Sequence, residues 1–173
     1  MKDETLESLC ARRSIRKYKP DQIASETLEA VLRAGTYAPS GMNRQSAAIV
    51  VVQDRETRDL LSLINAQIMG TDGDPFYGAP TVLVVFADSR CPTYVEDGSL
   101  VLGNLLNAAY AAGLGSCWIH RARQTFETPE GKSLLQKWGL DENFVGIGNC
   151  ILGYPAEVPA AKPVKENRLY YVR

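Results

Sequence analysis

Two uninterrupted runs of apolar, largely β-branched residues dominate the sequence, AAIVVV at residues 47–52 and VLVVFA at residues 82–87. A strand with one face in water alternates apolar and polar residues, and these runs do not alternate. We therefore expect both to be central strands that are covered on both faces. Neither run approaches the ~20 apolar residues that a membrane-spanning helix needs, so we expect a soluble protein without a membrane partner.

Helical and strand-like patterns alternate along the rest of the chain. Apolar residues at helical spacing predict a short helix near the N-terminus and helices over 25–38, 56–69 and 128–139. Residues 98–115 are apolar nearly all round, which is typical of a helix buried on every side. Apolar runs predict further strands over 115–120 and 143–153, so the order of elements is mixed α and β throughout.

Length and charge narrow the classes of protein further. At 173 residues the chain is expected to form a single domain, residues 1–173. The 19 Lys and Arg residues are balanced by 20 Asp and Glu residues, which argues against a nucleic-acid partner. Acidic residues in the first ten positions do not suit a secretory signal, so we expect a cytoplasmic location.

The cysteines and the lone histidine give no metal site. The four cysteines are far apart in the sequence and the single histidine is His120, so a zinc site is not expected. We interpret the cysteines as small buried hydrophobic residues.

The segment CARRSIRKYKP, residues 10–20, is the first candidate site. In an extended chain Arg12, Ser14 and Arg16 share one face, because successive side chains alternate. Two guanidinium groups beside a hydroxyl suit a phosphate monoester. A solvated cationic helix end remains the alternative.

The segment TYAPSGMNRQS, residues 36–46, is the second candidate. Pro39, Ser40 and Gly41 favour a turn that brings backbone groups close to a ligand, and Asn43 and Gln45 carry amides that can read the edge of a heterocycle. An ordinary turn that caps the next element remains possible.

The segment GLGSCWIHRA, residues 113–122, is the third candidate. Trp118, His120 and Arg121 follow a predicted strand, a place where α/β proteins commonly meet their ligands. A histidine that is merely hydrogen-bonded fits as well. The P-loop, dinucleotide-binding and G-x-S-x-G patterns are absent, which argues against nucleotide hydrolysis and serine hydrolase chemistry.

After Gly153 the chain becomes rich in proline and cations, which predicts an extended C-terminal arm. Its last residues, RLYYVR, are strand-like and have no neighbour in sequence, so they can pair with a sheet edge, including one on another subunit.

Together, ARRSIRKY at 11–18, APSGMNRQ at 38–45, GLGSCWI at 113–119 and GYP at 153–155 resemble the flavin-dependent nitroreductase family, most closely its short members. The resemblance covers nearly the whole chain. It implies an α+β fold of three layers, α/β/α, with a mixed central sheet flanked by helices. It also implies a homodimer with two flavin mononucleotide (FMN) sites between the subunits and an extended C-terminal arm that embraces the partner.

The resemblance further implies an activity. Bound FMN would take hydride from NAD(P)H and pass it to a flat, electron-poor acceptor such as a nitroaromatic or a quinone, by a ping-pong mechanism. The flavin performs this chemistry, so no side chain is assigned as catalytic.

Carried across by motif, three groups of residues would bind the cofactor. The phosphate group comprises Arg12, Arg13, Ser14 and Arg16; the loop from the partner subunit comprises Pro39, Ser40, Gly41 and Asn43; and the strand beside the ring comprises Trp118, Ile119 and His120.

Two departures from the family pattern are visible. Where relatives often carry Lys-x-Arg in the tail, Lys162 is followed by Pro163 and Val164, so Lys165 or Arg168 would have to complete the phosphate site. His120 and Arg121 stand where many larger relatives have an acid and a glycine.

Three alternatives remain open. The first is a flavin-binding protein without turnover, for storage or sensing, and the second is another flavin reduction on the same fold, such as reductive dehalogenation. The third is an anion-binding interaction domain with no flavin.

Overall fold

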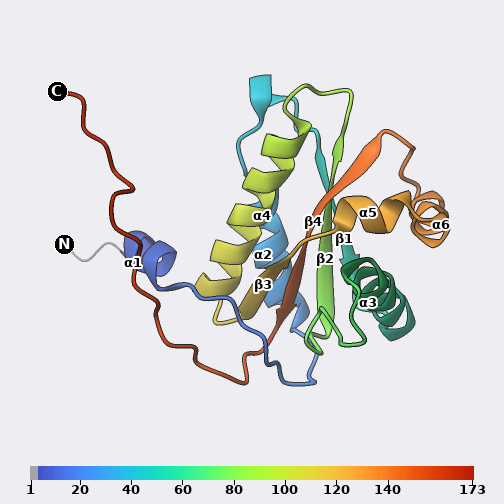
Figure 1. Cartoon of the computed structure of the whole chain (residues 1–173), viewed down its shortest axis with the longest axis horizontal. Coiled ribbons are helices and arrows are strands. Elements are labelled where there is room, and N and C mark those ends of the chain that lie inside the picture. Colours follow the sequence, from blue (N-terminus) through green and yellow to red (C-terminus); the bar gives the residue numbers. More distant parts are fainter. Residues whose placement is uncertain (1–3) are drawn as a thin grey trace.

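One four-stranded sheet runs through the part of the chain that the computed structural model describes, residues 4–173 (Figure 1). The strands are β1 (Ala47–Val52), β2 (Thr81–Asp88), β3 (Gly115–Ile119) and β4 (Phe144–Gly153), in the order β1-β2-β4-β3. The three ladders are all antiparallel, and a bulge between Val85 and Phe86 shifts the register of β2 against β4.

The sheet differs from the expectation in two respects. A mixed sheet was predicted, but the only parallel pairing among the described residues is the isolated bridge between Ser14 and Ser116. The connection from β1 to β2 starts and ends at the same end of the sheet, so these neighbours run in opposite directions. The prediction that β1 is central is also wrong, because β1 is an edge strand and only Val52 in it is buried.

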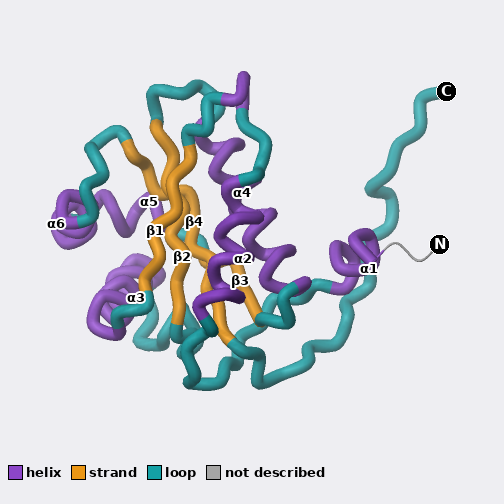
Figure 2. The backbone as a smooth tube through the Cα atoms, turned by 180° about the vertical axis from the view of Figure 1, so that it is seen from behind, coloured by secondary structure: helices purple, strands orange, loops and turns teal. Residues whose placement is uncertain are grey.

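Helices cover both faces of this sheet, which confirms the three-layer α+β fold (Figure 2). One face carries α2 (Ser25–Thr36) and α4 (Tyr94–Ala111). The other carries α3 (Arg55–Met69), α5 (Ala122–Glu127) and α6 (Pro129–Lys137). Helix α1 (Glu4–Ala11) stands apart beside the C-terminal residues, and a 3-10 turn, η1 (Gly41–Asn43), precedes β1.

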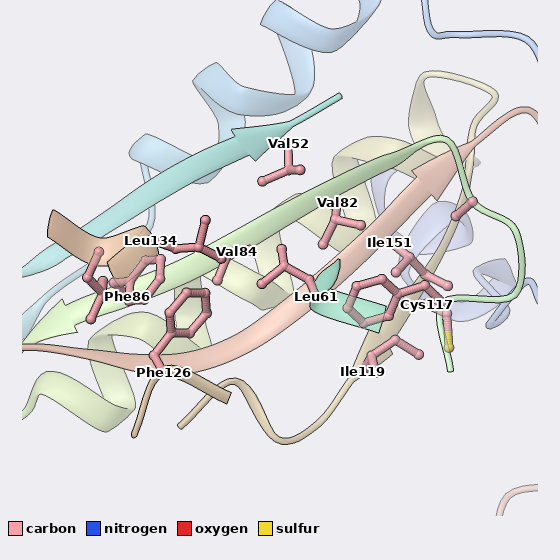
Figure 3. Packing of buried hydrophobic residues seen from close by; sticks show 13 residues of the cluster. Val52, Leu61, Val82, Val84, Phe86, Cys117, Ile119, Phe126, Leu134 and Ile151 are labelled. Atoms are coloured by element: carbon pink, nitrogen blue, oxygen red, sulfur yellow. The ribbon is translucent and has the colours of Figure 1, made fainter. Parts of the chain in front are cut away.

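Strand β2 sends alternate side chains into two cores. Val82, Val84 and Phe86 join the cluster under α3, α5 and α6, which Figure 3 shows. Leu83 and Val85 join the cluster under α2 and α4. Because each face meets an apolar layer, this run has no reason to alternate, as the sequence indicated.

Local signals account for the helix boundaries. Asp54 caps α3 by accepting from the backbone N–H of Thr57 at 2.8 Å, and Gly70 ends it in the left-handed region, φ +73°. Thr128 caps α6 at Gly131 N, 3.1 Å, ahead of Pro129. Helix α5, which the sequence analysis did not predict, starts directly after β3.

Helix α4 is not buried on every side, contrary to the prediction from its composition. Its inner face packs on the sheet through residues such as Leu105, but Leu100 is 46% exposed and Tyr110 is 39% exposed.

The four cysteines differ in burial: Cys117 and Cys150 are buried, whereas Cys10 is exposed and Cys91 is half-buried. The interpretation of all four cysteines as buried is therefore wrong for two of them.

Beyond Gly153 the chain forms no helix or strand. It first runs beside the N-terminal segment, where Lys19 N donates to Tyr154 O and Ala156 N donates to Lys17 O, both at 2.9 Å. The last residues are exposed and extend away from the layers (Figure 1). No helix among residues 4–173 is long and apolar enough to cross a membrane.

Candidate functional site

The N-terminal segment after α1 is fixed to the outer edge of β3. Ile15 is buried, and its backbone N–H donates to Ser116 O at 3.0 Å. A Cβ on Gly115 would lie 3.0 Å from the Ile15 side chain, so a glycine there lets the segment approach the strand. Tyr18 holds the next turn by donating its hydroxyl to Ile15 O at 2.7 Å, and burial raises the pKa of this phenol.

A first hollow, the Arg12 hollow, has a volume of about 350 Å³. Arg12 and Arg13 line it together with Ser116, and residues 155–161 of the C-terminal segment form its opposite wall. Arg13 is already engaged, because its Nη1 donates to Cys10 O and Arg12 O at 2.8 Å each and so caps α1. Arg12 is therefore the guanidinium group best placed to meet an anion here.

A second hollow, the Trp118 hollow, has a volume of about 300 Å³. Cys117, Trp118, Ile119 and His120 line it from the end of β3, and Arg16 lines it from the N-terminal segment. The rings of Trp118 and His120 pack edge to face, with centroids 5.6 Å apart.

The two hollows lie at the same stretch of β3, since Ser116 lines the first and its neighbour Cys117 lines the second. Successive side chains of a strand point to opposite faces, so the hollows lie on the two sides of this edge strand. Ser14, bridged to Ser116, lies at the boundary between them. Arg12 and Arg16 thus line neighbouring hollows, although their alternation suggested one shared site. The structure brings the first and third sequence-predicted groups to β3, with Arg12 in one hollow and Trp118 and His120 in the other.

The turn that follows β3 is held by two buried amides. Asn149 Nδ2 donates to Ile119 O at 3.3 Å, and Asn65 Nδ2 donates to His120 O at 2.8 Å. Asn65 is fully buried in α3, and its Oδ1 has no hydrogen-bond partner among the described residues. Asn65 lines neither hollow, so its role here is to hold the turn from behind.

Asn65 was not among the residues predicted from the sequence. Its place among Leu61, Ile64 and Ile68, on the apolar face of α3, could have indicated a buried polar residue with a structural role.

The loop with the second motif lies elsewhere. Pro39 and Ser40 line a third hollow of about 410 Å³ beside β1, and Ser40 Oγ accepts from Gln45 N at 2.9 Å. Gly41 and Asn43 form the 3-10 turn, at the opposite end of the molecule from the N-terminal segment in both Figures 1 and 2. Within one chain this loop lines neither the Arg12 hollow nor the Trp118 hollow.

The tail lysines lie near the Arg12 hollow in sequence. Ala161 lines the hollow, Lys162 follows it directly, and Lys162 and Lys165 are both exposed.

The largest hollow, about 700 Å³, lies between α5, α6 and the start of β4 and holds none of the predicted site residues. The chemistry of the lining residues therefore identifies the candidate site better than size does.

Known proteins resemble this chain in sequence. A sequence model of the family described as "Nitroreductase family" matches residues 9–75. A protein of Archaeoglobus fulgidus, described as a candidate NADH dehydrogenase/NAD(P)H nitroreductase, is 34% identical over 161 residues, which cover 90% of this chain and 87% of that protein. An FMN reductase [NAD(P)H] of Bacillus subtilis is 27% identical, over 93% of this chain and 70% of its own length.

The fold comparison agrees. A nitroreductase with bound FMN from Bacteroides fragilis superposes with a TM-score of 0.90 at 30% identity, covering 99% of this chain and 100% of that one. The three-layer fold and these similarities show that the chain belongs to the nitroreductase family.

Proposed function

We propose that the protein is an FMN-dependent oxidoreductase that uses NAD(P)H. The observation that carries this proposal is the adjacency of a cationic hollow and an aromatic hollow on either side of the Ser14–Ser116 bridge. A phosphate and a flat ring, joined by a short chain, need such a pair of neighbouring sites. Relatives named as NAD(P)H-dependent flavin reductases, and a related structure with bound FMN, support the same cofactor.

The residues present fit FMN in charge: Arg12 and Arg13 outweigh the one carboxylate in the Arg12 hollow, Glu157, and leave it net positive. Arg12 would hold the phosphate with Arg13 and Ser14 beside it, and Lys162 or Lys165 would add a cation from the tail. Arg16, Trp118, Ile119 and His120 would hold the ring. Buried Asn65 would fix the turn behind the ring by donating to His120 O.

We further propose that the active form is a homodimer in which Pro39, Ser40, Gly41 and Asn43 reach the ring bound by the partner. Three features support this arrangement: the loop is far from the hollows of its own chain, α4 exposes Leu100 and Tyr110, and β1 leaves an open edge. Apolar side chains on the exposed tail, among them Leu169, Tyr170 and Tyr171, suit an arm that lies on a second subunit. Each chain is proposed to be one domain, since both cores pack on the same sheet.

When bound, FMN supplies the redox chemistry, accepting hydride from NAD(P)H and delivering it to nitroaromatics, quinones or similar flat acceptors in a ping-pong cycle. The chain's own residues would bind and orient the flavin and the substrates. The cations at the phosphate fix the position of the ring, and the exposed Trp118 and His120 rings bound a slot in which flat molecules can stack. No side chain is needed as an obligate acid or base.

Flavin titration followed by reduction tests this proposal. Protein stripped of flavin should quench the fluorescence of added FMN with one equivalent bound per chain. NADH or NADPH should then bleach the bound flavin under anaerobic conditions, and a quinone should restore its colour. Failure to bind FMN would contradict the proposal, whereas tight binding without bleaching would identify a flavin-binding protein without turnover.

A further inference from the structure

Arg121 has an unusual backbone for its residue type. It lies two residues after the end of β3, with φ +78° and ψ +13°, in the left-handed region that glycine adopts without strain and a residue with a Cβ does not. Backbone strain of this kind persists where the surroundings impose it, and it clusters at functional sites.

The residues around Arg121 hold it in this left-handed conformation. The two carbonyls before Arg121 are held by the buried amides of Asn149 and Asn65, at 3.3 and 2.8 Å. The next residue, Ala122, is fully buried and begins α5. The turn is therefore fixed on both sides, and it carries the Arg121 side chain to the wall of the Trp118 hollow.

The charges that line this hollow do not balance. Arg16 and Arg121 are permanently charged guanidinium groups, and His120 adds ring N–H groups. The one carboxylate in the lining is Asp74. Both of its oxygens are occupied: Oδ2 accepts from Arg58 and Gly78 N, and Oδ1 accepts from Ser62 and Phe76 N.

No other acid neutralises Arg121. Among residues 4–173 no ion pair joins Arg121 to a carboxylate. Glu157 binds the backbone N–H of Arg16, but it lines the Arg12 hollow instead. The Trp118 hollow, which we propose holds the flavin ring, thus keeps an excess of positive charge, and a flat acceptor stacked on that ring would meet it.

We infer that this hollow selects electron acceptors that carry an anionic group, and that Arg121 is the residue that recognises it. The inference rests on the proposed function and names its substrate class: an electron-poor ring bearing a carboxylate. A charge-assisted hydrogen bond from a guanidinium group favours a carboxylate over a neutral amide of the same shape. Arg16 lines the same hollow and contributes to the same positive field.

The chemical step leaves the carboxylate unchanged. For a nitro acceptor, R–NO2 + NAD(P)H + H⁺ gives R–NO + NAD(P)⁺ + H2O. The nitro group gains two electrons and loses one oxygen as water, and the nicotinamide loses a hydride. The one proton consumed comes from solvent, and the other hydrogen of the water formed is the transferred hydride.

The test compares 4-nitrobenzoate with 4-nitrobenzamide, which share a shape and differ in charge, for the holoenzyme at saturating NADH. The wild type should show a kcat/KM at least about tenfold higher for the acid, the ratio that one charge-assisted contact of about 1.4 kcal/mol supplies. Arg121→Gly removes the cation and relaxes the backbone, so it should fold well and bring the ratio close to one. Arg121→Lys should keep most of the preference.

Arg55→Ala is the charge-matched control. Arg55 is 93% exposed at the start of α3, whereas Met69 at the far end of that helix lines the hollow. The ratio should not change in this variant. Calorimetry provides a readout without turnover: benzoate should bind the oxidised wild type more tightly than benzamide, and Arg121→Gly should lose the difference.

The anionic group can also come from the donor, since NADPH carries a phosphate that NADH lacks. Bleaching rates with each donor, measured before any acceptor is added, separate the two sources. Loss of an NADPH preference in Arg121→Gly, with the acid-to-amide ratio unchanged, would overturn the inference and assign Arg121 to the donor. Equal kcat/KM for acid and amide in the wild type would also overturn it.

These outcomes are distinct from failure of the proposed function. Protein that binds no FMN, or bound flavin that neither donor bleaches, contradicts the oxidoreductase itself and this inference with it. Flavin that is bleached and then reoxidised equally by both acceptors contradicts this inference alone.

Discussion

The buried carboxylate of Asp97 accepts a hydrogen bond from the backbone N–H of Gly41 at 2.9 Å, joining the first turn of α4 to the loop before β1. Its second oxygen accepts from Ser46 Oγ at 2.6 Å, at the other end of the same loop. Burial raises the pKa of Asp97, but hydrogen bonds from Ser46, Gly41 and Thr93 outweigh it and hold that pKa below its ordinary value. The loop proposed to serve the partner is thus positioned by a charge on α4.

Asp97→Asn should destabilise the chain by about 1.5–3 kcal/mol at neutral pH, because hydrogen bonds to a charged acceptor are lost inside the protein. Urea denaturation measures the change. Glu96→Gln is the matched control, one residue away on the exposed side of the same helix. Equal stability of the two variants would show that Asp97 does not hold the loop.

The stabilisation by Asp97 should also depend on pH. Since its pKa is lower in the folded than in the unfolded chain, the contribution is complete above the unfolded value of about 3.9 and is lost as pH falls through the folded value. The pKa of Asp74 is lowered for the same reason: burial raises it, but the hydrogen bonds from Arg58 and Ser62 lower it by more. The difference between wild type and Asp97→Asn should therefore be constant from pH 7 to about 5 and shrink below about 4. A difference that grows with acidification would contradict this assignment.

Gly41→Ala should displace the loop. A Cβ at this position would lie 2.2 Å from Thr93 Oγ1, which is far inside contact distance. We expect FMN to bind at least about tenfold more weakly, a loss of about 1.4 kcal/mol or more, as measured by fluorescence titration. The double variant with Thr93→Ala should recover part of that affinity; no recovery would show that the clash is not the cause.

Arg12→Ala should weaken FMN binding by about 10- to 150-fold, the equivalent of a 1.5–3 kcal/mol charge-assisted contact. Lys132→Ala is the control, since Lys132 is an exposed cation on α6 that lines the separate large hollow. Equal FMN affinity in the two variants would remove Arg12 from the phosphate site.

Asn65→Leu should weaken FMN binding by about tenfold, since it removes the donor to His120 O that holds the turn beside the proposed ring site. Gln67→Leu, on the exposed side of the same helix, controls for the change in helix composition. Undiminished FMN affinity in Asn65→Leu would assign this amide to the fold alone.

The sequence predicted the elements better than their surroundings. The apolar run of β2 correctly indicated a strand covered on both faces, but the similar run of β1 lies at an edge. An apolar residue is expected to be buried, but the sequence does not say whether its own chain or a second subunit buries it. The exposed Leu100 of α4 is the same case, and a second subunit is the cover we propose.

Of the site, the sequence indicated the segments and missed the residues that hold them in place. Alternation placed Arg12 and Arg16 on an extended segment, as observed, but the division into two hollows depends on the contact with β3. Asp97 and Asn65 act across 56 and 55 residues of sequence, on Gly41 and His120 respectively. The left-handed backbone of Arg121 is imposed by tertiary hydrogen bonds. Because the residue is an arginine and not a glycine, nothing in the sequence indicated this conformation.

Mixing two defective chains tests the two-subunit flavin site most directly. Arg12→Ala and Gly41→Ala homodimers should each bind FMN weakly, because every site in them has one defect. A heterodimer of the two chains has one site with both defects and one with neither, if the loop serves the partner. Subunit exchange should therefore restore tight binding of one FMN per heterodimer, measured by fluorescence titration after purification of the mixed dimer. Exchange that restores no tight site would show that Gly41 and Arg12 of the same chain build one site, and it would contradict the shared flavin site.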